Sequence, residues 1–544
     1  ANDGTGSTLR EAFDICNDNF TELYGGTTSA LGFKSEGTNF TGSLLIGHST
    51  TGVISSAEEN TGVGIGALDA LTTGGSNVAV GYNAGTSINS GASNVVVGFA
   101  AGDALSSGSQ NVAIGRNSLT TEDTGSRNTA IGRGTLQNLN FNGNGYNVAV
   151  GYNAGLNVTT GTQNTLIGSA AGDAVTTGEF NVAMGYNALS SATDTDQSVA
   201  IGHNALAALN YSGDSNNTAV GHNAGASVVY GIKNTLLGAF AGDALTDGQK
   251  NVAVGYNALS TEDGHGRNVA VGHETLKNLN AGVDAYNVAV GYDAGLSVTS
   301  GAQNTLIGGL AGDALTVGER NTALGYSALS AEDTGGHNTG IGYRALSQLN
   351  YDGNGYNTAL GSDAGRKVST GIQNTILGAT AGDALTTGSD NVAIGYAAMT
   401  TDDAGGRNVA VGAFALRMQN GGDANVYNIG IGYGAGSSMT SGTLNTIIGG
   451  NAGDALTTGS SNIAIGYNAL STEDTGQANI AIGQGALQNA NYDGTGYNVA
   501  VGHDSGNDIT TGVRNVIVGG LAGDALTTGS YNVAIGYEAL TTED

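Results

Sequence analysis

The sequence contains no proline and no tryptophan, a single cysteine, and charged residues at only 11% of its 544 positions. One cysteine, Cys16, excludes an internal disulfide framework and a zinc site built from cysteines. No run of about 18 apolar residues is present, so the sequence predicts no membrane insertion. The lack of proline beside 95 glycines also excludes collagen, which needs proline-rich Gly-X-Y triplets.

The scarcity of basic residues limits the partners of the chain. Lysine and arginine number 16 against 45 acidic residues, which gives a formal net charge of −29. Nucleic acid is therefore not an expected partner, because phosphate binding needs cations. Anionic membrane surfaces are disfavoured for the same reason. The hydrophobic residues are mostly Ala, Val, Ile and Leu, which suits many thin layers better than one thick core.

A short repeat covers most of the chain. The pattern Asn-x-x-aliphatic-Gly begins at Asn77, Asn94, Asn111 and Asn128 and continues at spacings of 17, 17, 17 and 19 residues, a superperiod of 70 residues. The register spans residues 43–544 and defines 29 coils, each numbered here from its asparagine as position 1. The marker Ala-Gly-Asp-Ala recurs once per superperiod, at Asp103, Asp173, Asp243, Asp313, Asp383, Asp454 and Asp524.

This repeat predicts an all-β fold, a parallel β-solenoid or β-roll. A unit of 17 residues is too short for a helical-hairpin repeat, which needs about 33. Val78 and Val80 point to one face of a strand, and Ala79 and Gly81 to the other. Both faces are apolar, so we expect both to be covered, with two short strands and two turns per coil. At about 4.8 Å per coil the stack is expected to reach about 140 Å.

Two columns of the repeat are expected to be structural. Asparagine at position 1 stacks from coil to coil and predicts a hydrogen-bonded ladder of side-chain amides, as at Asn77, Asn94 and Asn111. Glycine at position 5 permits close approach of a second backbone, as at Gly81, Gly98, Gly115 and Gly132.

The amino-terminal residues do not follow the repeat. A capping box at Thr8–Glu11 precedes apolar residues at spacings of 4, 3, 4 and 3, which predict a short coiled-coil helix for trimerisation: Leu9, Phe13, Cys16, Phe20 and Leu23. We therefore divide the chain into an attachment segment (residues 1–24), a connector rich in Gly, Thr and Ser (25–42) and a solenoid shaft (43–544).

The repeat and the amino-terminal residues resemble two groups of known proteins. The repeat Asn-Val-Ala-Ile-Gly-Tyr, at 391–396, resembles the repeats of phage tail-fibre proteins. Its core Val-Ala-Ile-Gly is similar to the head repeat of trimeric autotransporter adhesins of the YadA type. The stretches 2–6 and 17–24 resemble a leader of tailed-phage structural proteins. The coils here are longer than the usual adhesin-head coil.

The resemblance implies a parallel homotrimer that serves as a structural fibre of a virion appendage and attaches to the host surface. It also implies attachment to other tail or baseplate proteins through the amino terminus. The alternative is a bacterial surface adhesin of the trimeric autotransporter type. An ice-binding solenoid is a minor alternative, suggested by pairs such as Thr176-Thr177, which do not form a regular Thr-x-Thr ladder.

Candidate binding residues are few and repeat with the coils. Aromatic side chains at position 6 are candidate contacts for a host glycan: Tyr82, Tyr152 and Tyr292. Acidic residues in turns are minor candidates for a metal such as Ca²⁺: Asp103, Asp173, Glu122 and Asp123. We expect Glu122-Asp123 to form a solvated turn. Most of the seven histidines replace tyrosine at position 6, and we expect neither metal-ligand spacing nor a catalytic triad. The sequence therefore predicts no enzyme and no cofactor.

Overall fold

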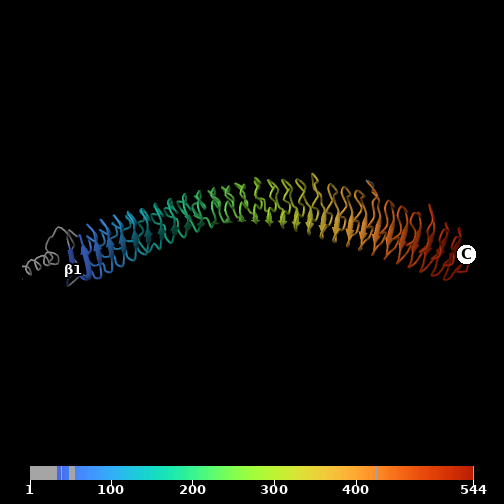
Figure 1. Ribbon diagram of the computed structural model, residues 1–544, viewed down its shortest axis with the longest axis horizontal. Coiled ribbons are helices and arrows are strands. Elements are labelled where there is room, and N and C mark those ends of the chain that lie inside the picture. Colours follow the sequence, from blue (N-terminus) through green and yellow to red (C-terminus); the bar gives the residue numbers. More distant parts are fainter. Residues whose placement is uncertain (1–32, 38–39, 48–55, 423–424, 543–544) are drawn as a thin grey trace, which may run out of the picture. The chain divides into compact units, whose positions relative to one another are not determined.

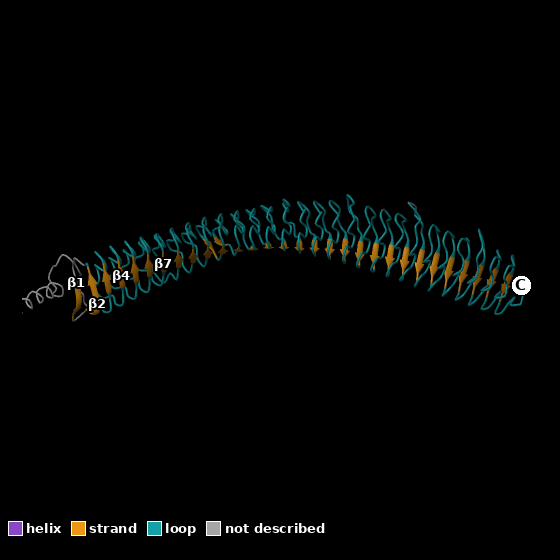
Figure 2. Cartoon of the chain, in the orientation of Figure 1, coloured by secondary structure: helices purple, strands orange, loops and turns teal. Residues whose placement is uncertain are grey.

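The computed structural model describes residues 33–37, 40–47, 56–422 and 425–542, which form a parallel β-solenoid without helices in this described part (Figure 1). Each of the 29 coils contributes one strand, and these strands are coloured orange in Figure 2. The predicted fold class and repeat register are confirmed. The helix predicted within residues 1–24, with its seam Leu9–Leu23, lies outside the described residues.

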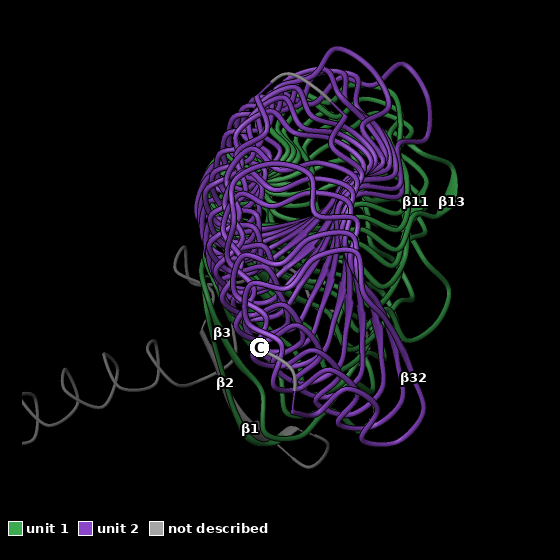
Figure 3. Ribbon diagram, turned by 90° about the vertical axis from the view of Figure 1, so that its right-hand side faces the viewer, with its two compact units in different colours: residues 1–266 green, residues 267–544 purple. Residues whose placement is uncertain are grey.

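The chain divides into two compact units, residues 1–266 and 267–544, coloured separately in Figure 3. The coil strands of the first unit are β2 (Phe40–Ile46), β3 (Thr61–Val63), β4 (Val78–Val80), β5 (Val95–Val97), β6 (Val112–Ile114), β7 (Thr129–Ile131), β8 (Val148–Val150), β9 (Thr165–Ile167), β10 (Val182–Met184), β12 (Val199–Ile201), β14 (Thr218–Val220), β15 (Thr235–Leu237) and β16 (Val252–Val254). Those of the second are β17 (Val269–Val271), β18 (Val288–Val290), β19 (Thr305–Ile307), β20 (Thr322–Leu324), β21 (Thr339–Ile341), β22 (Thr358–Leu360), β23 (Thr375–Leu377), β24 (Val392–Ile394), β25 (Val409–Val411), β26 (Ile429–Ile431), β27 (Thr446–Ile448), β28 (Ile463–Ile465), β29 (Ile480–Ile482), β30 (Val499–Val501), β31 (Val516–Val518) and β32 (Val533–Ile535).

The first coil strand has an additional partner. β1 (Phe33–Gly37) pairs antiparallel with β2, whereas β2 pairs in parallel with β3. The segment predicted to be only a connector therefore contains a strand, and it covers an edge of the sheet that would otherwise present unpaired backbone groups.

The second strand predicted in every coil is absent from nearly all of the described residues. The exception is a two-residue pair, β11 (Thr195–Asp196) with β13 (Gly213–Asp214). Elsewhere the far side of each coil is a series of turns, although its backbone still bonds from coil to coil, as in Gly85 N–H to the Ala101 carbonyl at 2.9 Å. Residues with positive φ, such as Asn83 at 52°, interrupt the extended conformation that a strand requires.

The small residues of the strand point inward. Ala79 is fully buried, whereas the flanking Val78 and Val80 are 37% and 38% exposed. Position 12 completes the interior with a larger apolar side chain, such as the fully buried Leu105. The coil is therefore thin, and bulky residues at positions 2 and 4 face outward.

Positions 3 and 9 vary together so that neighbouring coils fill one interior. Where position 9 is leucine, as at Leu136, position 3 of that coil is alanine or glycine. Where position 9 is Gly155, a Cβ would lie 2.7 Å from the Leu166 Cδ1 of the next coil, so the larger side chain comes from position 3 there. This exchange keeps the packing dense without widening the coil.

Asparagine at position 1 connects adjacent coils through buried hydrogen bonds. The Oδ1 of Asn77 accepts the backbone N–H of Asn94 at 3.0 Å, and the Nδ2 of Asn77 donates to the carbonyl of Gly91 in its own coil at 2.9 Å. The same two contacts recur along both units. Serine replaces asparagine at Ser43 and Ser198. The Ser43 hydroxyl oxygen accepts the backbone N–H of Asn60 at 2.7 Å, and the Ser198 hydroxyl pairs with that of Ser215.

We predict that Gly308→Ala destabilises the second unit by about 2 kcal/mol, because alanine must adopt a strained backbone conformation there. Gly308 has φ +133°, and a Cβ would lie 2.5 Å from the carbonyl oxygen of Gly325. Gly309→Ala is the matched control, since its nearest contact would be an ordinary 3.5 Å to Tyr326 Cδ2. Thermal unfolding followed by circular dichroism measures both variants. Equal midpoints for the two would contradict the close-approach explanation.

Candidate functional site

The outward side chains of the coil strands form an exposed apolar surface, here called the strand face and consisting of positions 2 and 4. Position 2 is Val, Thr, Ile or Leu in all 29 coils, and position 4 is always aliphatic or methionine. These residues are half-exposed, with Val148 at 37% and Leu237 at 47%. No charged residue interrupts either position, which is unusual for a surface in water.

Two polar columns border the strand face. The ring column is position 6, where aromatic rings stack along the solenoid: Tyr186 and His203 have centroids 5.3 Å apart, and His203 and His222 are 5.2 Å apart. The edge column is the last residue of each coil, where Arg127 lies 5.5 Å from the ring centroid of Tyr146. Such residues have positive φ, as at Arg127 (63°) and Tyr146 (52°), which turns the chain before the next asparagine.

Charge is segregated between these columns and the rest of the coil. Residues 43–544 contain 14 lysines and arginines, of which nine lie in the ring and edge columns, whereas only Glu59 and Asp390 of the 39 acidic residues do so. The nine are Arg116, Arg127, Arg133, Lys233, Lys250, Arg267, Arg320, Arg407 and Arg514. The borders of the strand face are thus cationic and aromatic in a strongly acidic chain.

The predicted glycan contacts lie in the ring column and are exposed. Tyr82 is 49% exposed and stacks on Phe99, with ring centroids 5.2 Å apart. Tyr292 stacks on His273, and the guanidinium of Arg133 lies over the ring of Tyr152. Each ring therefore already contacts a neighbour in its own chain, while its exposed surface remains open to a sugar or to another protein.

The acidic metal candidates do not come together. Asp103 and Asp173 are half-buried, and burial raises the pKa of each carboxyl group. The Oδ1 of Asp173 is buried without a hydrogen bond. Within the described ranges, neither aspartate belongs to a group of three potential metal ligands. Asp123 is exposed, and its backbone carbonyl accepts the N–H of Ser106 at 2.8 Å.

The prediction of a solvated turn at Glu122 is wrong, because this side chain is fully buried. Its Oε1 accepts the N–H of Gly125 at 2.7 Å, and its Oε2 accepts the N–H of Phe141 at 3.3 Å. Glu122 occupies position 12, where Leu105 fills the interior of the preceding coil. Alignment of the coils at that position would have revealed the buried carboxylate, but the turn-like sequence Glu-Asp-Thr-Gly hid it.

The buried carboxylate recurs in four further coils that precede a longer one: Glu262, Glu332, Asp402 and Glu473. Burial raises the pKa of Glu332 to about 7 and that of Asp402 to about 6, since the charged form loses its hydration. In the first coil of the series the carboxylate receives a backbone N–H of the longer coil, so its role there is to satisfy the lengthened turn.

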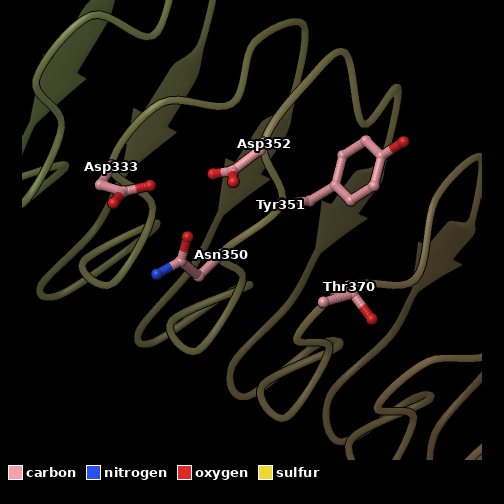
Figure 4. A pocket seen from close by; sticks show the side chains of 5 residues that line it. All are labelled: Asp333, Asn350, Tyr351, Asp352 and Thr370. Atoms are coloured by element: carbon pink, nitrogen blue, oxygen red, sulfur yellow. The ribbon is translucent and has the colours of Figure 1, made fainter.

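A shallow hollow lies beside one of these longer coils and is lined by Asp333, Asn350, Tyr351, Asp352 and Thr370 (Figure 4). Its two carboxylates already have partners in Thr334. The backbone N–H of Thr334 donates to Asp333 Oδ1 at 2.7 Å, and its hydroxyl donates to Asp352 Oδ1 at 2.8 Å. The hollow therefore offers one aromatic side chain and a polar rim, a modest surface for a ligand.

Membrane insertion was not expected from the sequence. In the part of the chain that the structure describes, no helix has the length and apolar character needed to cross a bilayer.

We predict that Glu332→Gln changes the pH dependence of stability. The folded pKa of about 7 lies above the ordinary glutamate value of 4.5, because burial disfavours the ionised form in the folded state. Stability contributed by this group is fully present below about pH 4.5 and is lost as pH rises through 7. The glutamine variant should lack that loss, about 3 kcal/mol. Denaturant midpoints from pH 4.5 to 8 measure it, with the exposed Glu319→Gln as control. Parallel pH profiles for Glu332→Gln and the wild type would contradict the prediction.

Comparison with known proteins does not place this chain in a family. No family model matches it, and no curated protein matches it. Its function must therefore be argued from the strand face, the two columns that border it and the buried polar groups.

Proposed function

We propose that the chain is a structural fibre of a virion appendage, assembled as a parallel homotrimer through the strand face. The observation that carries the proposal is the strand face itself, which presents apolar or threonine side chains in all 29 coils and no charge. An isolated chain would leave this surface in water. A partner that covers it gains the hydrophobic free energy of burial, about 25 cal/mol per Å².

A second copy of this chain fits the strand face better than an unrelated partner. The 13 coil strands of the first unit, at about 4.8 Å each, extend the face for about 60 Å. With a width of about 10 Å, the face of that unit alone approaches the size of the largest patches found on monomers. Another copy has the same spacing of side chains and remains in register along the whole of such a face.

The bordering columns favour a parallel arrangement around an axis. Rotation about an axis along the solenoid sets the edge column of one chain opposite the ring column of the next. Arginines and lysines of the edge column then face tyrosine, histidine and phenylalanine, a pairing that supports cation–π contacts. An apolar centre with aromatic residues and arginine beside it is the composition typical of protein interfaces.

The acidic turns support the same assembly. Most of the net charge of −29 per chain lies outside the strand face and its borders, so it faces solvent in the trimer. Such a surface keeps neighbouring fibres apart and soluble. A role in host attachment, and attachment to tail or baseplate proteins through residues 1–24, follow from the resemblance to tail fibres.

The bacterial adhesin alternative uses the same trimer and differs in where the protein is found. Immunogold labelling of the source particles or cells separates the two, since label on phage tails supports the virion fibre and label on the cell surface supports the adhesin.

Ice binding is less well supported, because the Thr176 hydroxyl is engaged with the Thr193 carbonyl at 3.1 Å. An ice-binding surface needs its threonine hydroxyls free.

We predict a native mass of about 161 kDa, three times the 53.6 kDa of one chain. Val80→Lys combined with Val150→Lys should weaken the trimer, because assembly would bury unpaired charges. Ser90→Lys with Thr160→Lys is the matched control, since both of these residues are exposed in the turns of the same coils. Native mass spectrometry and analytical ultracentrifugation measure assembly, and circular dichroism checks the fold.

A stable wild-type monomer would overturn the proposal, and a dimer would overturn its threefold symmetry. Equal effects of the strand-face and turn variants would show that the strand face is not the interface.

A further inference from the structure

We propose that Glu262, Asp263 and His265 bind a divalent first-row transition-metal ion, with Zn²⁺ as the ion to test. Their ligand atoms, two carboxylate oxygens and a histidine ring nitrogen, all lie within 4.8 Å of one another. The three residues belong to one turn of the first unit. The sequence led us to expect no metal-ligand spacing among the histidines, and the proposal departs from that expectation at His265.

This turn departs from its equivalents in the other superperiods. The buried carboxylates Glu122, Glu332 and Glu473 are each followed by Asp-Thr-Gly, whereas Glu262 is followed by Asp263-Gly264-His265. Histidine thus replaces glycine at position 15. In an otherwise regular repeat, a local departure that adds a metal-binding side chain next to a buried carboxylate points to a function beyond stacking.

The backbone geometry forces a side chain at position 15 against the carboxylate. A Cβ placed on Gly335 would lie 2.5 Å from Glu332 Oε1, and one on Gly476 would lie 2.4 Å from the carboxyl carbon of Glu473. A histidine at this position must therefore stand beside the buried glutamate. At His265 the backbone N–H donates to Glu262 Oε1 at 3.1 Å, which holds that oxygen on the side of the imidazole.

The imidazole presents a buried nitrogen without a hydrogen bond. His265 Nδ1 lies 3.6 Å from Glu262 Oε1, too far for a hydrogen bond, and it has no other hydrogen-bond partner. The His265 side chain is 34% exposed, and Asp263 is exposed, so an ion can reach the turn from solvent. A cation between Nδ1 and the carboxylates would provide the missing partner, and water would complete its coordination.

The ligand set selects the kind of metal. Imidazole nitrogen with carboxylate oxygen suits Zn²⁺ and neighbouring transition ions, whereas Ca²⁺ and Mg²⁺ prefer oxygen ligands alone. A second group of potential ligands, His273, Glu274 and Asp293, is less suited to a metal. There the ammonium of Lys277 lies 2.8 Å from Glu274 Oε1 and already neutralises that carboxylate.

The test uses the full chain without a polyhistidine tag, in a Cys16→Ser background that removes the thiol. Equilibrium dialysis with Zn²⁺ should give one ion per chain, and Co²⁺ should give visible absorption bands that persist in excess Ca²⁺. His265→Gly restores the residue of the equivalent coils and should weaken binding by more than about tenfold. His273→Gln is the matched control and should leave binding unchanged. Circular dichroism verifies that both variants retain the solenoid.

Three results of the Zn²⁺ binding experiments would overturn the proposal. They are the absence of saturable Zn²⁺ binding, binding that His265→Gly leaves unchanged, and binding that His273→Gln removes. The first would leave His265 and Glu262 as an ion pair without metal. Displacement of Co²⁺ by Ca²⁺ would also exclude the imidazole as a ligand and overturn it.

Discussion

In most coils the asparagine at position 1 makes hydrogen bonds within its own coil and to the next coil, and the regular stacking of both units depends on this pair of contacts. Its Nδ2 closes the coil at a glycine carbonyl, while its Oδ1 sets the position of the next asparagine. Both groups are buried, so a missing partner would cost about 1–3 kcal/mol. The close spacing in turn requires glycine at position 5, where the adjacent coil leaves no room for a Cβ. At Ser198 the two serine hydroxyls replace the amide contact, and the short β11–β13 pair lies close by in the sequence.

A coil closed in this way has a narrow interior, and the exposed surface follows from that narrowness. Alanine fits inside at position 3, so valine and isoleucine at positions 2 and 4 face outward. The coil cannot fold over its own strand to cover them. Cationic and aromatic residues gather at its borders while acidic residues occupy the turns, so charge and apolar area are sorted by position in the coil rather than by region of the chain.

The repeat made the fold predictable because one register is stated 29 times in the sequence, and strand, turn and asparagine positions follow from it. The repeat did not show which side of the strand faces the interior. Val78, Ala79 and Val80 are all apolar, and alternation with a period of two does not distinguish the inner side from the outer side. The second strand was predicted from apolar residues such as Leu105, which in fact fill the interior from a turn. Glu122 was predicted to be solvated because the sequence around it is typical of a turn. Its burial depends instead on its position in the coil. At His265 the sequence shows only that histidine replaces the glycine of the equivalent coils. A metal site could be inferred there only once the structure had placed the buried carboxylate beside it.

The regular repeat also determines which positions of the coil can accept a side chain that binds a ligand. Positions 1 and 5 contact the adjacent coils, and positions 3, 9 and 12 fill the interior, so substitutions there disturb stacking. The turn before five of the six longer coils differs, because inward N–H groups of the longer coil need an acceptor and a carboxylate is drawn into the interior. That carboxylate costs hydration free energy at neutral pH but is held in place by backbone donors. Each superperiod with this buried carboxylate therefore already has an oxygen that could bind a metal, and that oxygen is present for structural reasons. One further substitution in the adjoining turn is enough to add a nitrogen ligand, and the surrounding coils keep the geometry rigid without any other change.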